Sequence, residues 1–147
     1  MVTRYSKEEI KALCEEANEK RLYGISFLNN FSLAQIQDEF NGVGAEFLGD
    51  EIRGWLSDVL KVFLAAAMIH DLRNAMSDGS RVKFWSANDE FRRNCNKLAK
   101  AKYGIFTRKR YRALLVAQVL YFFVSTEAFG WKAWIDAKNK REKNFKQ

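Results

Sequence analysis

The side chains that could carry out chemistry begin with a histidine and an aspartate that are adjacent in the chain. His70 is the only histidine in the sequence, and Asp71 follows it directly. A neutral imidazole can act as a general base on water when a partner fixes its tautomer and stabilises the developing charge. Asp89 is the natural candidate for this partner if the two helices that carry these residues pack antiparallel. Asp71 would then be left to bind a hard cation.

A short loop with two glycines precedes the histidine and reads Phe40-Asn41-Gly42-Val43-Gly44. Asn-Gly is a strong turn dipeptide, and glycine tolerates the backbone angles that turn successive carbonyl groups inward. Calcium takes about six to eight oxygen ligands. The loop can therefore supply carbonyl oxygens to a calcium ion that Asp71 also binds, and such an ion would polarise a substrate carbonyl and stabilise an oxyanion.

In this order, an aromatic-x-Gly-x-Gly loop, a His-Asp pair and a later aspartate resemble the pattern of the phospholipase A2 family. The gap from His70 to Asp89 resembles that of the compact bacterial, fungal and viral members, and the stretch from Asn88 to Cys95 resembles the compact bacterial ones. The resemblance implies hydrolysis of the sn-2 ester of a glycerophospholipid, with His70 as the base and Asp89 orienting it. It also implies a set of calcium ligands: Asp71 and the carbonyl groups of Phe40, Gly42 and Gly44.

The sequence differs from the family pattern in several places. The segment 45–69 between the loop and the histidine is longer than usual, and Asn74 stands where a tyrosine is common. The two cysteines, Cys14 and Cys95, are too few for the disulfides of secreted members and are expected to be reduced and buried. With one histidine they cannot complete a zinc site without carboxylates. A phage or prophage protein would fit these differences.

Each candidate residue also has a purely structural interpretation. His70 could be a half-buried helix residue bonded to a backbone carbonyl group. Asp71 could pair with Arg73, Arg53 or another cation at the surface. Asp89 could be a first-turn acid stabilised by the helix dipole, and the glycine loop could simply be a turn.

The net charge of +7 and the pI near 9.5 would attract phosphate groups, in lipid headgroups, in nucleic acid or in neither, and the charge by itself does not choose among these. Part of the excess lies in the tail, and the rest forms one cluster, which comprises Arg108, Lys109, Arg110 and Arg112. These residues make two non-enzymatic alternatives possible. One is a basic helical phage or prophage protein that binds nucleic acid or assembles with other proteins, although no zinc finger or RNA-binding signature supports it. The other is a protein that lies on a membrane surface through its basic tail and exposed aromatic residues.

Length and composition predict one all-α domain over residues 1–137, a bundle of about five helices, followed by a basic tail over 138–147 that frays. Apolar residues make up 48% of the chain, and proline is absent. The first residues lack the apolar segment of a secretory signal, and the longest apolar run, Ala113 to Val124, is too short to span a bilayer. We therefore expect a soluble or surface-bound protein in the cytoplasm or the virion.

The elements that must position the candidate site are expected to be helices. Capping boxes that begin at Ser6 and Ser32 predict helices over 7–22 and 33–40. An apolar stripe predicts one long helix from Asp50 to about Met76, or two with a break near Gly54 or Lys61.

Two further helices are expected after the His-Asp pair. A capping arrangement at Ser86 predicts that the helix carrying Asp89 starts there, after a connection over 80–85 with a short extended piece. Thr107 is predicted to cap a last helix that runs to about Ala137, with Gly130 as its weak point.

Overall fold

The computed structural model describes residues 5–40 and 57–147. Every regular element in these two ranges is helical, so the predicted all-α class is confirmed. In chain order the elements are α1 (Lys7–Glu19), α2 (Ile25–Leu28), α3 (Leu33–Glu39), a helical segment over 57–62, α5 (Leu64–Ala75), α6 (Arg81–Lys102), α7 (Arg108–Ser125), the π-helical turn η2 (Glu127–Trp131) and α8 (Lys132–Phe145).

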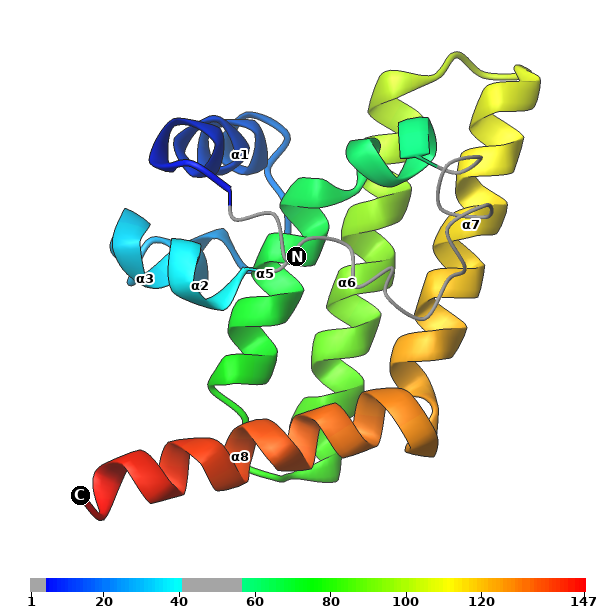
Figure 1. Ribbon diagram of the computed structural model, residues 1–147. Helices are drawn as coiled ribbons and strands as arrows, with labels where there is room; N and C mark the ends of the chain where they lie inside the picture. The colour runs from blue at the N-terminus through cyan, green and yellow to red at the C-terminus, as the bar shows by residue number, and fades with distance from the viewer. Residues whose placement is uncertain (1–4, 41–56) are drawn as a thin grey trace.

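Helix α5 lies at the centre of the fold. It runs antiparallel to α6, and α7 continues the same layer, while α1, α2 and α3 pack on the other side of α5 (Figure 1). Helix α8 crosses the lower ends of this layer and contacts α5. Seven of the 12 residues of α5 are buried, and they include His70. A helix whose buried residues surround most of its axis is a core helix, which explains how the only histidine comes to be enclosed.

The N-terminal helices begin where their capping residues predict. The Ser6 hydroxyl accepts a hydrogen bond from the Glu9 backbone at 3.1 Å, and the Glu9 carboxylate accepts one from the Ser6 backbone at 2.7 Å. The same reciprocal pair joins Ser32 and Gln35. Helix α1 ends at Glu19 rather than at residue 22, because the chain turns there through a left-handed backbone at Arg21.

The start of α6 differs from the prediction. Ser80, not Ser86, is its N-cap, and the Ser80 hydroxyl accepts from the Lys83 backbone at 3.2 Å. The expected connection over 80–85 is therefore helical, and its Phe84 is buried in a small cluster with Trp134 of α8. Asp89 consequently lies inside α6, so its interpretation as a first-turn acid is wrong.

The last predicted helix is divided in two. Helix α7 ends at Ser125, Thr126 caps η2 through its hydroxyl, and the axis bends by 57°. A Cβ atom on Gly130 would clash with the Val124 carbonyl group, so this close approach of two backbone segments requires glycine. Helix α8 then continues to Phe145, and the tail expected to fray from residue 138 is part of it.

In the described ranges, no single helix has the length and apolar character needed to cross a membrane. The bent pair formed by α7 and residues 127–145 passes that test only when the two are taken together.

Candidate functional site

The candidate site is built around the imidazole of His70, which is only 7% exposed. Its Nε2 atom lies 2.8 Å from Oδ1 of Asn88 on α6. The ring of Phe91, one turn further along α6, lies against the imidazole with 4.8 Å between ring centroids. The imidazole is therefore fixed by one hydrogen bond and one ring contact from the same neighbouring helix.

The tautomer of His70 follows from the second contact of Asn88. The Asn88 side chain is fully buried, and its Nδ2 donates to the Val124 carbonyl oxygen at 3.1 Å. Since that carbonyl can only accept, the amide must present Oδ1 to the histidine, and Nε2 of His70 must donate. The neutral ring then carries its lone pair on Nδ1, the nitrogen that a base needs.

This arrangement depends on the glycine after the α7 bend. The Val124 carbonyl group that accepts from Asn88 is also the group that approaches Gly130. Gly130, Val124, Asn88 and His70 thus form one connected series from η2 to α5. The sequence marked Gly130 only as a weak point of a helix, whereas in the fold it gives the carbonyl the space to support the histidine's hydrogen-bond partner.

Burial lowers the pKa of His70 below its ordinary value of 6.5. The hydrogen bond to Asn88 and the charge of Glu90 act in the opposite direction, but the loss of hydration is the larger effect. Glu90 is itself held by Arg73 through two hydrogen bonds of 3.1 and 3.0 Å. The ring is therefore neutral at neutral pH.

The predicted contact between His70 and Asp89 is wrong. The Asp89 carboxylate pairs with Arg92 at 2.5 Å and with Arg93 at 2.9 Å on its own helix. Successive helical residues point about 100° apart, so Asn88 and Asp89 cannot both face α5. The sequence did indicate that Asn88 faces the core, because it lies three positions before the apolar Phe91 and so shares the buried face of the helix.

Two structural alternatives for the His-Asp pair also change. His70 bonds to a side-chain amide and not to a backbone carbonyl group. Arg73 pairs with Glu90, while Arg53, another cation suggested for Asp71, lies outside the described residues.

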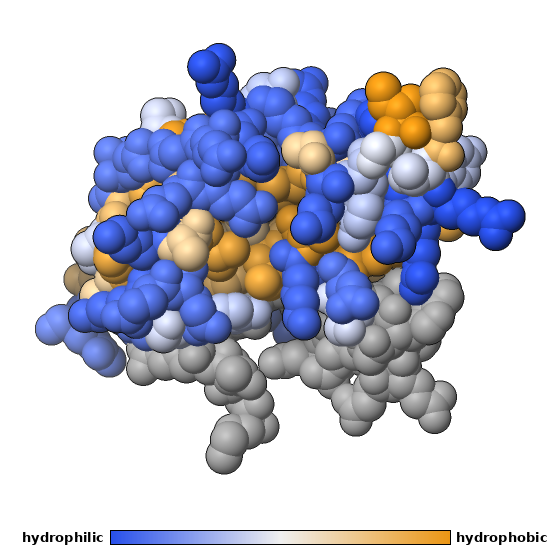
Figure 2. Space-filling view, turned by 90° about the horizontal axis from the view of Figure 1, so that it is seen from above, coloured by the Kyte–Doolittle hydropathy of each residue, from blue (hydrophilic) through white to orange (hydrophobic). Residues whose placement is uncertain are grey.

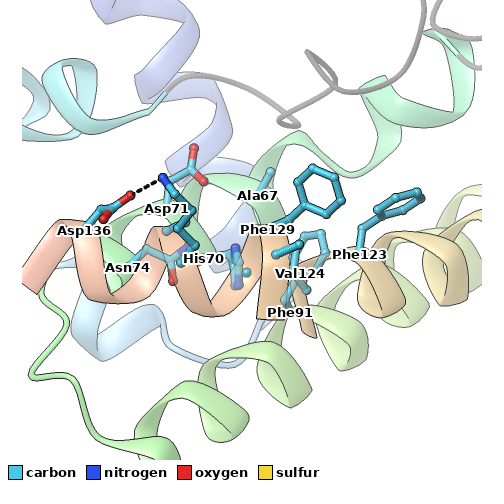
Figure 3. A pocket seen from close by; sticks show the side chains of 13 residues that line it. Ala67, His70, Asp71, Asn74, Phe91, Phe123, Val124, Phe129 and Asp136 are labelled. Atoms are coloured by element: carbon cyan, nitrogen blue, oxygen red, sulfur yellow. Dashed lines mark hydrogen bonds and ion pairs between the residues drawn. The ribbon is translucent and has the colours of Figure 1, made fainter. Parts of the chain in front are cut away.

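His70 lines a cavity of about 380 Å³ between α5, α6, η2 and the ends of α7 and α8. Its apolar wall includes the rings of Phe91, Phe123 and Phe129 (Figure 3). Its polar side holds Asp71 and an ion pair of 2.9 Å between Lys132 and Asp136 of α8. A cavity of this size, mostly apolar with a few polar groups at one side, suits an amphiphilic ligand.

The expected calcium ligands are placed only in part. Asp71 also lines a second cavity of about 420 Å³, together with Asp38 and Glu39 near the end of α3. Phe40 follows as the C-cap of α3, while Gly42 and Gly44 lie outside the described residues.

The donors that are placed are oxygens, which suit calcium. Within residues 5–40 and 57–147, however, no three His, Cys, Asp or Glu residues form a group that could hold a metal ion. A complete calcium shell would therefore need the loop carbonyl groups that the resemblance implies.

The basic cluster, which comprises Arg108, Lys109, Arg110 and Arg112, lies in the first turns of α7. The cavity is at the opposite end of that helix, about 17 to 24 Å away along the axis at about 1.5 Å per residue. The cluster is therefore not part of the lining of the histidine site.

Comparisons with protein-family models, with curated proteins and with solved structures found no match.

Proposed function

We propose that this protein hydrolyses a carboxylic ester of a glycerophospholipid, with His70 as the base that activates water. The single observation that carries the proposal is the 2.8 Å bond between Nε2 of His70 and Asn88 on the wall of an apolar cavity. That bond sets the tautomer, and the cavity offers a place for an acyl chain beside the ring.

In the proposed reaction, Nδ1 of His70 takes a proton from a water molecule as the water oxygen bonds to the ester carbonyl carbon. The tetrahedral intermediate then expels the glycerol oxygen, which receives the proton from Nδ1. The products are a fatty acid and a lysophospholipid. Because Asn88 already accepts from Nε2, the ring does not need to reorient between the two proton transfers.

Calcium remains part of the proposal, with Asp71 and the Phe40 carbonyl group as the ligands that lie within the described residues. When bound, calcium would polarise the ester carbonyl and stabilise the oxyanion. Asp71 supports this role because it follows the histidine directly and lines the same cavity.

Asn88 sets a limit on the rate. An amide can fix the tautomer of the imidazole, but it cannot neutralise the imidazolium that forms when Nδ1 takes a proton. Replacing Asn88 by aspartate would supply that charge, but it would also place a carboxylate oxygen against the Val124 carbonyl oxygen that now accepts from the Asn88 amide, so this substitution does not isolate the effect of charge.

The test measures fatty-acid release from phospholipid vesicles, with calcium and with a chelator. We expect His70→Gln to lose about a hundredfold or more of the rate with little change in melting temperature. Asp89→Asn is the matched control and should behave like the wild type, because Asp89 contacts only arginines of α6 in the contacts described. A His70→Gln variant as active as the wild type would refute the proposal.

Two further measurements test the metal. Added calcium should raise both the melting temperature and the rate, and Asp71→Asn should weaken both effects. If calcium changes neither quantity while the His70→Gln variant is inactive, the base assignment stands and the calcium assignment is lost.

Nucleic-acid binding is the second candidate function, and the exposed Arg108 and Lys109 at the start of α7 favour it. Binding to nucleic acid would weaken steeply as salt rises, because phosphate contacts release counterions. A gel-shift titration at low salt that detects no complex would exclude this function.

A further inference from the structure

Helix α7 has an exposed apolar stripe on the side that faces away from the core. Tyr111, Leu115, Val119 and Phe122 follow one another at intervals of three or four residues, which places them on one face. They are 80%, 62%, 46% and 66% exposed. The opposite face of α7 is buried. A helix that is apolar on both sides normally has a neighbour on both sides, so this stripe lacks a partner in the described part of the chain.

The turn between α6 and α7 extends the same apolar surface. Ile105 is 68% exposed, and Phe106 is fully exposed with a left-handed backbone angle of 67°. Such an angle is uncommon for a bulky residue. The view from above shows apolar side chains projecting among hydrophilic ones at one edge of the molecule (Figure 2).

The segment of chain that forms this surface is rich in positive charge. Between Glu90 and Glu127 the sequence has nine lysine and arginine residues and no acidic residue. Arg108 lies three positions before Tyr111 and so shares its face of α7. Lys100 of α6 lines a groove of about 370 Å³ together with Tyr111 and Leu115.

We propose that this face of α7, with the α6–α7 turn, binds the surface of an anionic phospholipid membrane. An interfacial helix places its apolar side chains at the boundary of the acyl region and its cations among the headgroups. Nucleic acid would satisfy the cations but leaves the aliphatic Leu115 and Val119 without contacts. A second copy of the chain would cover the stripe, but it would bring together two surfaces that are both rich in lysine and arginine.

The stripe also leads to the histidine cavity. Phe122 contacts Phe123 with 6.1 Å between ring centroids, and Phe123 contacts Phe129 at 5.9 Å. Phe123 and Phe129 line the cavity. A membrane bound along α7 would therefore lie next to the cavity that holds His70. This last step rests on the proposed function, whereas the membrane-binding surface does not.

The experiment measures co-sedimentation of the full chain with vesicles of ether-linked phospholipids, which lack the ester and cannot be hydrolysed. Neutral phosphatidylcholine vesicles are compared with vesicles that also contain phosphatidylglycerol. Leu115→Glu combined with Phe122→Glu tests the stripe, and Val82→Glu is its control, because Val82 is a 79% exposed apolar residue on α6.

The basic part of the surface has a matched pair of its own. Arg108→Gln combined with Lys109→Gln removes two charges at the start of α7. Lys143→Gln combined with Lys146→Gln removes the same charge from the exposed end of α8.

We expect the wild type and both controls to bind anionic vesicles, and both α7 variants to bind at least tenfold more weakly. His70→Gln should bind like the wild type, so a failed hydrolysis assay and a failed binding assay are distinguishable. The proposal is overturned if the wild type does not bind, or if the stripe variant binds like the wild type. It is also overturned if the wild type is a dimer that the stripe variant converts to a monomer, because a second copy would then cover the stripe.

Discussion

Protonation of His70 should destabilise the folded protein as the pH falls below neutral. The folded pKa of His70 lies below the unfolded value of 6.5 because the ring is buried. The unfolded chain therefore takes up a proton before the folded chain does. The contribution of the neutral His70 ring to the unfolding free energy is fully present above about pH 6.5 and is lost as the pH falls from there towards the folded pKa.

The size of this effect is limited by a single proton. The unfolding free energy cannot change by more than about 1.36 kcal/mol per pH unit through one proton. Each unit by which burial lowers the pKa of His70 adds about 1.36 kcal/mol to the total loss of unfolding free energy. Solvent screening reduces it little, because the ring is only 7% exposed. Glu90 on α6 opposes the shift, and Lys132 and Asp136 of α8 line the same cavity.

The assay compares urea unfolding of the wild type and His70→Gln at a series of pH values in EDTA, which excludes any cation at Asp71. The other titrating groups are common to both proteins, so the difference in unfolding free energy isolates His70. The imidazole signal can also be followed by NMR without assignment, because the chain has one histidine. A signal that titrates at or above 6.5, or a difference that does not vary with pH, would refute the account of the buried ring.

Three further outcomes are expected. Asn94→Ala should lower the unfolding free energy by about 2 kcal/mol or more in urea titrations. The buried Asn94 side chain forms hydrogen bonds with the backbone N–H and C=O groups of Tyr23 at 2.7 and 2.9 Å, and each group left unsatisfied costs roughly 1–3 kcal/mol. A variant as stable as the wild type would contradict this. Burial raises the pKa of the Cys95 thiol, so a thiol reagent should modify the half-buried Cys14 well before Cys95 in the folded protein, and Cys95 only on unfolding. Gly130→Ala should lower the unfolding free energy by roughly 1–3 kcal/mol, because the added Cβ atom overlaps the Val124 carbonyl group, and it should also shift the imidazole NMR signal of His70. An unchanged unfolding free energy would contradict the steric argument, and an unchanged imidazole signal would contradict the link to His70.

Local signals located the starts of several helices from the sequence alone. Ser6, Ser32 and Thr107 each cap the helix predicted for them, since a hydroxyl oxygen can satisfy a backbone N–H group three residues away. Ser86 offered a similar pattern, but Ser80 begins α6, where Gly79 adopts a left-handed backbone and Phe84 packs against α8. A capping pattern identifies possible helix starts, and packing of distant segments selects among them.

The sequence by itself determined the helical class, the presence of a histidine beside an aspartate on a helix, and the late excess of positive charge. Only the tertiary structure decided that Asn88, and not Asp89, meets the imidazole. The choice depends on the rotation of α6 about its axis, and packing against α5 and α7 sets that rotation. The tertiary structure also decided that Gly130 supports the site, because the contact between the Gly130 backbone and Val124 exists only once the chain bends between α7 and α8.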